Sequence, residues 1–201
     1  MQAFKTSITK EEINKLPRYK YSGEIKVIET HDDSKAAILE LKSEKILGFD
    51  TETRPAFKKG ESHHVSLLQL ASETTVYLFR LNKLFDLKEL YEVLSDPNIV
   101  KAGVAVRDDI KALNKLYKFK AENFVDLATI AKQKQIENFG LRALTAIVLG
   151  KRLSKGAKIS NWEKDSITPA QIEYAACDAA VGRSIYQKFI HEGFTEVKNE
   201  Q

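Results

Sequence analysis

The fold of this chain is decided by a seven-residue stretch in its first third, Ile46-Leu47-Gly48-Phe49-Asp50-Thr51-Glu52. The stretch is apolar or small on both faces until it reaches its acids, which is typical of a central strand covered on both sides. Side chains alternate along a strand, so Asp50 and Glu52 leave its carboxyl end on one face. Gly48 lies on that same face and leaves room for a neighbouring element. The stretch therefore predicts a buried central strand that ends in two adjacent carboxylates.

Two carboxylates at this spacing suggest a metal site. Like charges repel each other, and the repulsion raises the pKa values of Asp50 and Glu52 unless a cation compensates. Hard divalent ions such as Mg²⁺ supply that compensation and prefer oxygen ligands. Two solvated carboxylates at a strand end would carry the same pattern, and so short a motif does not decide between the two interpretations.

Periodicity along the rest of the chain predicts strands first and helices later. We expect further strands at residues 24–29, 65–71, 75–79 and 99–106, and helices at residues 32–43, 86–94, 107–117, 141–149 and 169–191. Residues 124–132 are predicted to hold a short strand or the start of a helix, and residues 53–64 and 151–166 are predicted to be loops. This order indicates one α/β domain with a mixed central β-sheet flanked by helices.

Both ends of the chain are predicted to extend beyond this domain. Residues 1–22 form an N-terminal extension with a short helix, which Thr9 caps and Pro17 ends, with Glu12 in the capping-box position. Residues 23–192 form the domain, and residues 193–201 form a C-terminal tail.

The composition of the 201 residues is that of a globular protein, with 43% hydrophobic and 30% charged residues. The formal net charge of +4 permits contact with nucleic acid but does not require it. The single cysteine, Cys177, excludes an internal disulfide and a multi-cysteine zinc site. The sequence has no apolar run of about 18 residues and no apolar segment typical of a secretory signal near its start. We therefore expect a cytoplasmic protein that makes no membrane contact.

Acidic residues also occur at two further places in the sequence where a purely structural role would not require an acid. Asp178 lies among small residues in Tyr174-Ala175-Ala176-Cys177-Asp178-Ala179-Ala180, which would let the helix backbone approach the sheet. Tyr174 precedes Asp178 by four residues and shares its helical face. Asp108 and Asp109 follow a buried strand at a helix start, where acids often serve as caps. Periodicity does not say which of these two is functional.

One segment is strongly basic. Residues 150–158 carry four cations and no acid: Lys151, Arg152, Lys155 and Lys158. Such a run indicates contact with phosphate groups. A solvated loop explains the same charges equally well, because exposed charges are common on protein surfaces.

Taken together, these motifs resemble those of the DnaQ-like 3'→5' exonuclease superfamily, whose three exonuclease motifs hold four acids. Phe49-Asp50-Thr51-Glu52 resembles the first motif and residues 102–113 resemble the second. Tyr174-Ala175-Ala176-Cys177-Asp178 resembles the third motif in its tyrosine-containing (DEDDy) form. The likeness runs over residues 24–192 and is greatest to the ribonuclease D and Werner-syndrome exonuclease domains. It implies an α/β domain with a ribonuclease H-like fold.

The resemblance also implies an activity. It points to a divalent-metal-dependent 3'→5' exonuclease that hydrolyses the phosphodiester bonds of DNA or RNA and releases nucleoside 5'-monophosphates. In such an enzyme two Mg²⁺ or Mn²⁺ ions would lie among Asp50, Glu52, Asp109 and Asp178. Tyr174 would orient the attacking water. The second-motif acid falls on Asp109 when residues 102–104 are placed on the end of the family's strand, with Asp108 as the alternative.

Nucleic acid is the partner that this resemblance implies. We expect Lys151, Arg152, Lys155 and Lys158 to contact its phosphates, and Phe57 to stack on a base. Two other functions use the same residues: a non-catalytic binding module that keeps the fold, and a two-metal phosphoesterase for small molecules. The presence of all four acids together with Tyr174 favours the exonuclease over the binding module.

Overall fold

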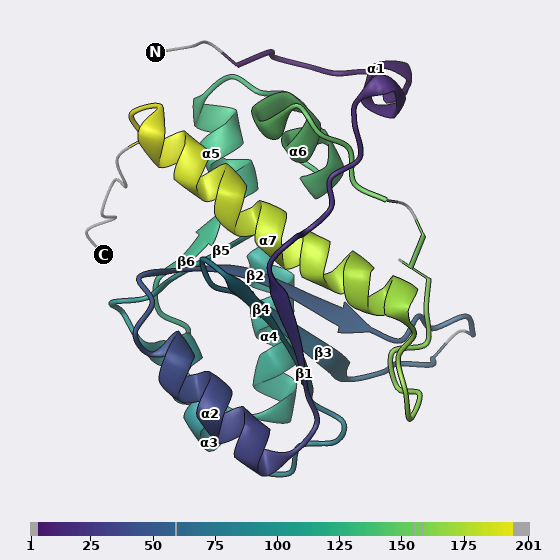
Figure 1. Cartoon of the computed structure of the whole chain (residues 1–201), viewed down its shortest axis with the longest axis vertical. Coiled ribbons are helices and arrows are strands. Elements are labelled where there is room, and N and C mark those ends of the chain that lie inside the picture. Colours follow the sequence, from purple (N-terminus) through teal and green to yellow (C-terminus); the bar gives the residue numbers. More distant parts are fainter. Residues whose placement is uncertain (1–3, 59, 155, 158, 195–201) are drawn as a thin grey trace.

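The computed structural model describes residues 4–58, 60–154, 156–157 and 159–194. Its centre is a mixed six-stranded β-sheet with the strand order β1-β4-β3-β2-β5-β6 (Figure 1). β2 pairs antiparallel with β3 and parallel with β5, so the two kinds of pairing meet at β2. The mixed sheet predicted from the sequence is confirmed. The strands are β1 (Glu24–Ile28), β2 (Ile46–Thr53), β3 (Val65–Ala71), β4 (Thr75–Arg80), β5 (Val100–Gly103) and β6 (Phe124–Asp126).

Helices cover both faces of this sheet. On one face lie α2 (His31–Leu41), α3 (Lys88–Ser95) and α4 (Val106–Leu116). The long helix α7 (Pro169–His191) crosses the other face, and α5 (Leu127–Gln133) and α6 (Leu141–Leu149) pack against it (Figure 1). α7 begins as the sequence predicts, with a capping box formed by Thr168 and Gln171 and with Pro169 in the first turn.

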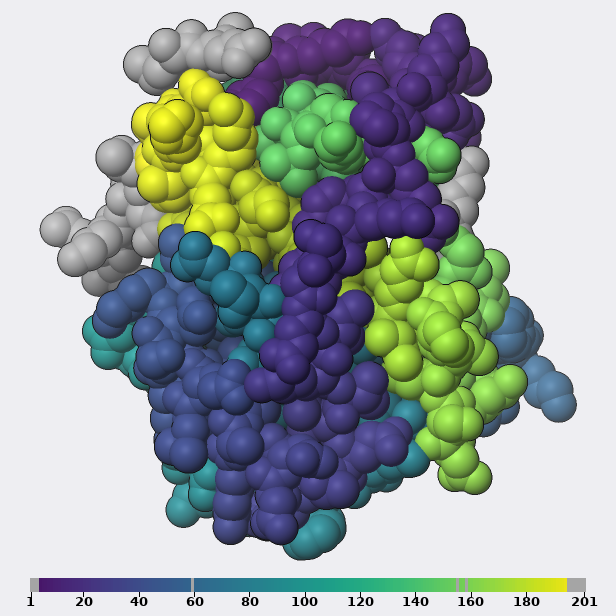
Figure 2. Space-filling model, in the orientation of Figure 1, coloured from purple at the N-terminus to yellow at the C-terminus, as the bar shows by residue number. Residues whose placement is uncertain are grey.

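Residues 4–22, named the N-terminal strap below, pack on the outside of α6 and α7 (Figure 2). The strap contains α1 (Lys10–Lys15), whose capping box joins Thr9 and Glu12 as predicted. Near its start the Phe4 ring meets the Phe189 ring of α7 edge to face, with centroids 5.4 Å apart. The strap therefore belongs to the packed structure, although the sequence sets it apart as an extension.

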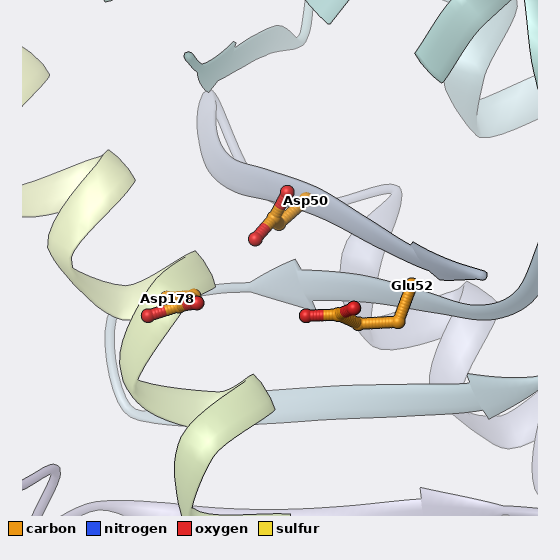
Figure 3. Close-up of side chains that lie close together, drawn as sticks. All are labelled: Asp50, Glu52 and Asp178. Carbon is orange, nitrogen blue, oxygen red and sulfur yellow. The ribbon is translucent and has the colours of Figure 1, made fainter. Parts of the chain in front are cut away.

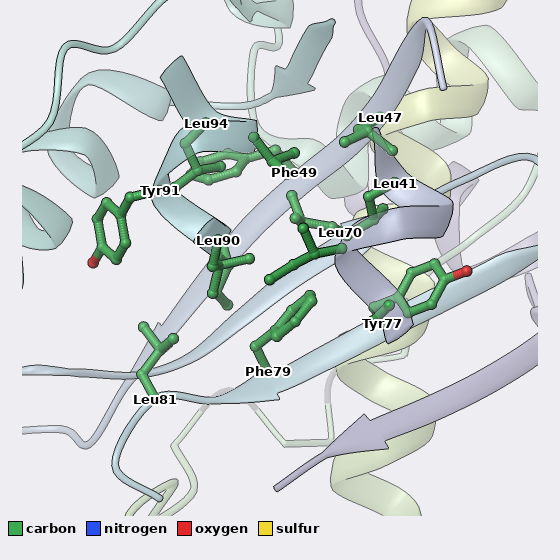
Figure 4. Packing of buried hydrophobic residues seen from close by; sticks show 14 of the residues in the cluster. Leu41, Leu47, Phe49, Leu70, Tyr77, Phe79, Leu81, Leu90, Tyr91 and Leu94 are labelled. Atoms are coloured by element: carbon green, nitrogen blue, oxygen red, sulfur yellow. The ribbon is translucent and has the colours of Figure 1, made fainter. Parts of the chain in front are cut away.

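The largest part of the core lies between the sheet and the helices α2, α3 and α4 (Figure 4). Phe49, Leu70 and Phe79 project from the central strands toward Leu41 of α2 and Leu90 of α3. β3 and β4 are buried along their whole length because helices cover both of their faces. This explains why their sequences are almost continuously apolar rather than alternating.

α7 lies so close to β2 that their backbones nearly touch. A Cβ atom added at Gly48 would lie 2.0 Å from the carbonyl oxygen of Ala179, and one at Gly182 would lie 2.9 Å from that of Ala102. The small residues around Asp178 are buried against the sheet. The glycine in β2 and the alanines in α7 together bring Asp178 up to the end of the central strand.

The structure differs from the sequence-based prediction at the end of β5. The strand was predicted to run to residue 106, but it ends at Gly103 and α4 begins at Val106. The chain turns at Ala105, which has a left-handed backbone with φ 59°, and its N–H donates to Asp126 Oδ1 at 3.2 Å. The same carboxylate caps α5, so residues 124–132 contain both a short strand and a helix start.

Within the described residues, no helix combines the length and the apolarity that a membrane crossing requires.

Candidate active site

Three carboxylates meet where β2 passes α7 (Figure 3). Asp50 and Glu52 project from the same side of β2, and Asp178 projects toward them from α7. One oxygen of each lies within 4.8 Å of the others, although Asp178 is far from Asp50 and Glu52 in the sequence. The structure therefore brings together three of the acids that the sequence motifs single out.

Burial and mutual repulsion both disfavour ionisation at this point. Burial raises the pKa of Asp50 well above its usual value, and the neighbouring charges of Asp178, Glu52 and Asp109 raise it further. The backbone N–H of Thr51 donates to Asp50 Oδ1 at 3.0 Å and opposes this shift in part. A cation would stabilise the charged carboxylates, and a set of carboxylate oxygens is the donor chemistry that hard divalent ions prefer. The residues present therefore fit a divalent metal ion.

Tyr174 lies one helical turn before Asp178 and lines the same cleft. Burial raises the pKa of its phenol far above the usual value, and the charges of Asp178 and Glu52 raise it further. Tyr174 is thus held protonated, so that it can donate a hydrogen bond to a neighbour but is a poor proton acceptor at neutral pH.

The two candidate acids of the second motif occupy different places. Asp109 lines the cleft from the first turn of α4, and Thr51 Oγ1 donates to its Oδ1 at 2.5 Å. Burial raises the pKa of Asp109 to about 6. The Asp108 side chain is 85% exposed and pairs with Lys111 at 3.1 Å. Of the two, the structure therefore places Asp109 at the site, next to but outside the three-carboxylate group.

These groups line a cleft of about 1040 Å³. The acids and Tyr174 lie on the side formed by β2, α4 and α7. The start of α6 and the chain around Ser154 contribute another side, and the strap contributes a third. Sequence reasoning singled out none of the cleft residues on these other sides, because no periodicity marks an exposed side chain as facing a cavity. They include Lys10, Asn14, Asn138 and Arg142.

The residues predicted to contact substrate differ in their exposure and in their contacts. Phe57 is 79% exposed on the loop after β2 and is not among the described residues that line the cleft. Lys151 is exposed after α6, whereas Arg152 Nε donates to the Leu16 carbonyl oxygen of the strap at 2.9 Å. The predictions for Lys155 and Lys158 fall outside the described residues.

In this fold the central strand of a mixed sheet and the last helix bring their carboxylates together. This is the kind of site that the sequence motifs imply. Comparison with known proteins identifies the family directly, because the family model described as "3'-5' exonuclease" matches residues 25–193. The chain belongs to this 3'-5' exonuclease family.

Two curated relatives and one solved structure illustrate the likeness. The chain is 37% identical over 156 residues to the bifunctional 3'-5' exonuclease/ATP-dependent helicase WRN of Mus musculus, which covers 75% of this chain and 11% of the mouse protein. It is 34% identical over 152 residues to exonuclease 3'-5' domain-containing protein 2 of Drosophila melanogaster, covering 74% of this chain and 26% of that protein. The chain therefore spans a minor part of the length of these relatives.

The fold is shared with Trypanosoma brucei RNase D, which was solved in complex with RNA U12. The two structures superpose with a TM-score of 0.77 at 22% sequence identity, over 89% of this chain and 65% of that one. This likeness confirms the ribonuclease H-like fold that the resemblance implies.

Proposed function

We propose that this chain hydrolyses the phosphodiester bonds of DNA or RNA from the 3' end and releases nucleoside 5'-monophosphates. The observation that carries the proposal is the convergence of Asp50, Glu52 and Asp178 in one cleft with Tyr174 and Asp109. Like charges are costly to bury together, so this arrangement makes physical sense where cations bind. Membership of the 3'-5' exonuclease family supports the direction of the reaction.

The cofactors in this proposal are Mg²⁺ or Mn²⁺, two ions to a site. Asp50, Glu52 and Asp178 would hold them, with Asp109 contributing from the edge of the cleft. Bound ions of this kind supply an activated water and neutralise the charge that develops on the leaving oxygen of an in-line displacement.

The side chains around the acids position them and hold protons. Thr51 holds the Asp109 carboxylate through its hydroxyl, and the closeness of α7 to Gly48 holds Asp178 against β2. Tyr174 keeps its proton, so it acts as a hydrogen-bond donor that orients water or carboxylate, and it does not serve as the general base.

The partner in this proposal is nucleic acid. The structure of Trypanosoma brucei RNase D with RNA U12 supports a nucleic-acid ligand for this fold. Lys151 is exposed at the end of α6 and is the described member of the basic segment with the freest access to a phosphate. Each phosphate contact of this kind steepens the salt dependence of binding to a single strand by roughly 0.7 in the log–log slope. The cytoplasmic location expected from the sequence stays a prediction.

Two rival functions make different predictions about metal and substrate length. A non-catalytic binding module would retain the fold and bind nucleic acid without cleaving it. A phosphoesterase for small molecules would need the metal but would show no preference for longer oligonucleotides. The complete set of acids favours an enzyme over the binding module, because a module that only binds gains nothing from buried, mutually repelling carboxylates.

The test uses oligonucleotides of DNA and of RNA, each labelled at its 5' end or at its 3' end. We expect a ladder of products shortened from the 3' end in Mg²⁺ or Mn²⁺, and none in EDTA. Asp178→Asn should be inactive but should stay folded and be as stable as wild type or slightly more stable without metal, because it relieves repulsion between like charges. Asp32→Asn is the matched control, because Asp32 is an exposed carboxylate on α2, across the sheet from the cleft. Shortening from the 5' end, or full activity in EDTA, would overturn the proposal.

A further inference from the structure

One wall of the cleft comes from the N-terminal strap. Lys10, Ile13 and Asn14 line the same cavity as Asp50 and Asp178. Their spacing of three and four residues puts them on one face of α1. Ile8, just before the helix, lines the cavity as well. This face of α1 therefore looks into the cleft that holds the carboxylates.

The strap is fixed in this place by contacts on both sides of α1. A six-residue helix is not stable by itself, so its position depends on these tethers. Before α1, the Ile8 N–H donates to Asn138 Oδ1 at 2.8 Å, and the Thr6 carbonyl accepts from the Glu137 N–H at 2.7 Å.

After α1, the strap is tied to Arg152. The Arg152 N–H donates to the Pro17 carbonyl at 3.0 Å, and the Tyr19 N–H donates to the Arg152 carbonyl at 2.9 Å. The Arg152 side chain adds its bond to Leu16. Asn138 and Arg152 lie just before and just after α6, so the strap spans the outside of that helix. Ile13 is 8% exposed and anchors α1 between the two sets of tethers.

The chemistry of this face complements a nucleic-acid strand. The Lys10 ammonium offers a point charge for a phosphate group, and the Asn14 amide offers both a donor and an acceptor. Ile8 and Ile13 give an apolar surface for a sugar or a base. The wall thus carries a cation and apolar groups, whereas the acids line the side of the same cleft formed by β2, α4 and α7. A strand between the two would meet the acids at its scissile bond and Lys10 at a phosphate.

We propose that the N-terminal strap is the outer wall of the substrate cleft, and that Lys10 and Asn14 hold the backbone of an unpaired 3'-terminal segment. The inference rests on the proposed exonuclease function. The cavity of about 1040 Å³ lies just above the roughly 300–1,000 Å³ typical of sites for one small ligand. Such a space suits a short unpaired end, and because the strap closes one side of it, we expect a paired second strand to be excluded.

The first test compares two charge reversals on the same helix. Lys10→Glu alters the face of α1 that lines the cleft, and Lys15→Glu makes the same change at an exposed position outside the cleft lining. Binding of a 5'-labelled single-stranded oligonucleotide is measured in Ca²⁺ over a series of salt concentrations.

We expect Lys10→Glu to weaken binding about tenfold and to flatten the log–log salt slope by roughly 0.7, the value of one phosphate contact. Lys15→Glu should change binding less than twofold. In Mg²⁺, Lys10→Glu and Asn14→Ala should raise KM and leave kcat unchanged, because they bind the strand away from the bond that breaks. Equal binding of the oligonucleotide by the Lys10→Glu and Lys15→Glu variants would overturn the proposed contact between Lys10 and a phosphate.

The second test concerns the unpaired end. The wild-type protein is given a duplex with a 3' overhang and a blunt duplex of the same sequence. We expect the overhang to be shortened and digestion to stop near the junction. Equal rates on both substrates would overturn the inference that the end must be unpaired. The proposed function is judged separately, because it fails only if the wild-type protein does not shorten a single strand from its 3' end in an EDTA-sensitive way.

Discussion

Replacing Gly48 by alanine is expected to push α7 away from β2. The added Cβ would lie 2.0 Å from the Ala179 carbonyl oxygen and 2.9 Å from the Arg183 backbone nitrogen. Ordinary van der Waals contact begins at 3.4 Å, so the closest pair falls short by about 1.4 Å. Both contacts are with backbone atoms of α7, which cannot swing aside as a side chain can. The helix and the strand must therefore separate.

The separation should cost both stability and activity. Overpacking of this kind destabilises a protein by about 1–3 kcal/mol. The shifted segment of α7 carries Asp178, the residue next to Ala179, so the distance from Asp178 to Asp50 should grow by about 1 Å. A misplacement of that size at a catalytic site costs about 10²-fold in rate. Gly48→Ala should therefore lose far more activity than its loss of stability alone explains.

The assay pairs the free energy of unfolding in urea with the initial rate of 3' shortening. Two other glycines provide a graded series. Gly182→Ala should have an intermediate effect, because its Cβ would lie 2.9 Å from the Ala102 carbonyl oxygen. Gly156→Ala should resemble wild type, because the nearest atom, Ser154 Oγ, is 3.5 Å away. A wild-type rate for folded Gly48→Ala would refute the argument that close packing of α7 positions the acids.

Three further outcomes follow from the geometry of single residues. Asp109→Ala should abolish 3' shortening while Asp108→Ala retains it, and the opposite result would move the second-motif acid by one residue. Tyr174→Phe should lower kcat by about 10²-fold, as expected for loss of one well-placed donor, and a loss as complete as that of Asp178→Asn would contradict a purely orienting role. Burial lowers the pKa of Lys101 to about 8, so its charge opposes folding at neutral pH, and this cost fades as the pH rises from about 8 toward the 10.5 of the unfolded chain. The free energy of unfolding of wild type should therefore gain about 2 kcal/mol relative to Lys101→Met between about pH 7 and pH 9.5, and parallel urea-denaturation profiles for the two proteins would contradict this.

Much of the fold and the centre of the site could be predicted from sequence because their signals are local. Alternation along β2 puts Asp50 and Glu52 on one face whatever the strand packs against. The small residues around Asp178 likewise indicate that α7 approaches another backbone closely, and Gly48 is the matching feature in β2. Such patterns indicate which face of a helix or strand is buried, whichever element packs against that face.

Tertiary structure alone decided which distant segments share the cleft. The motif register favours Asp109 over Asp108, but only the structure shows that Asp109 lines the cleft and accepts from the hydroxyl of Thr51 on a different element, whereas Asp108 is exposed. The place of Lys10 in the same cleft as the carboxylates depends on tethers that join the strap to both flanks of α6. An exposed lysine on a short helix has the same sequence pattern whether it faces solvent or a cavity. Only the packing of segments far apart in the chain distinguishes the two, and that packing is set by many weak contacts summed over the whole molecule.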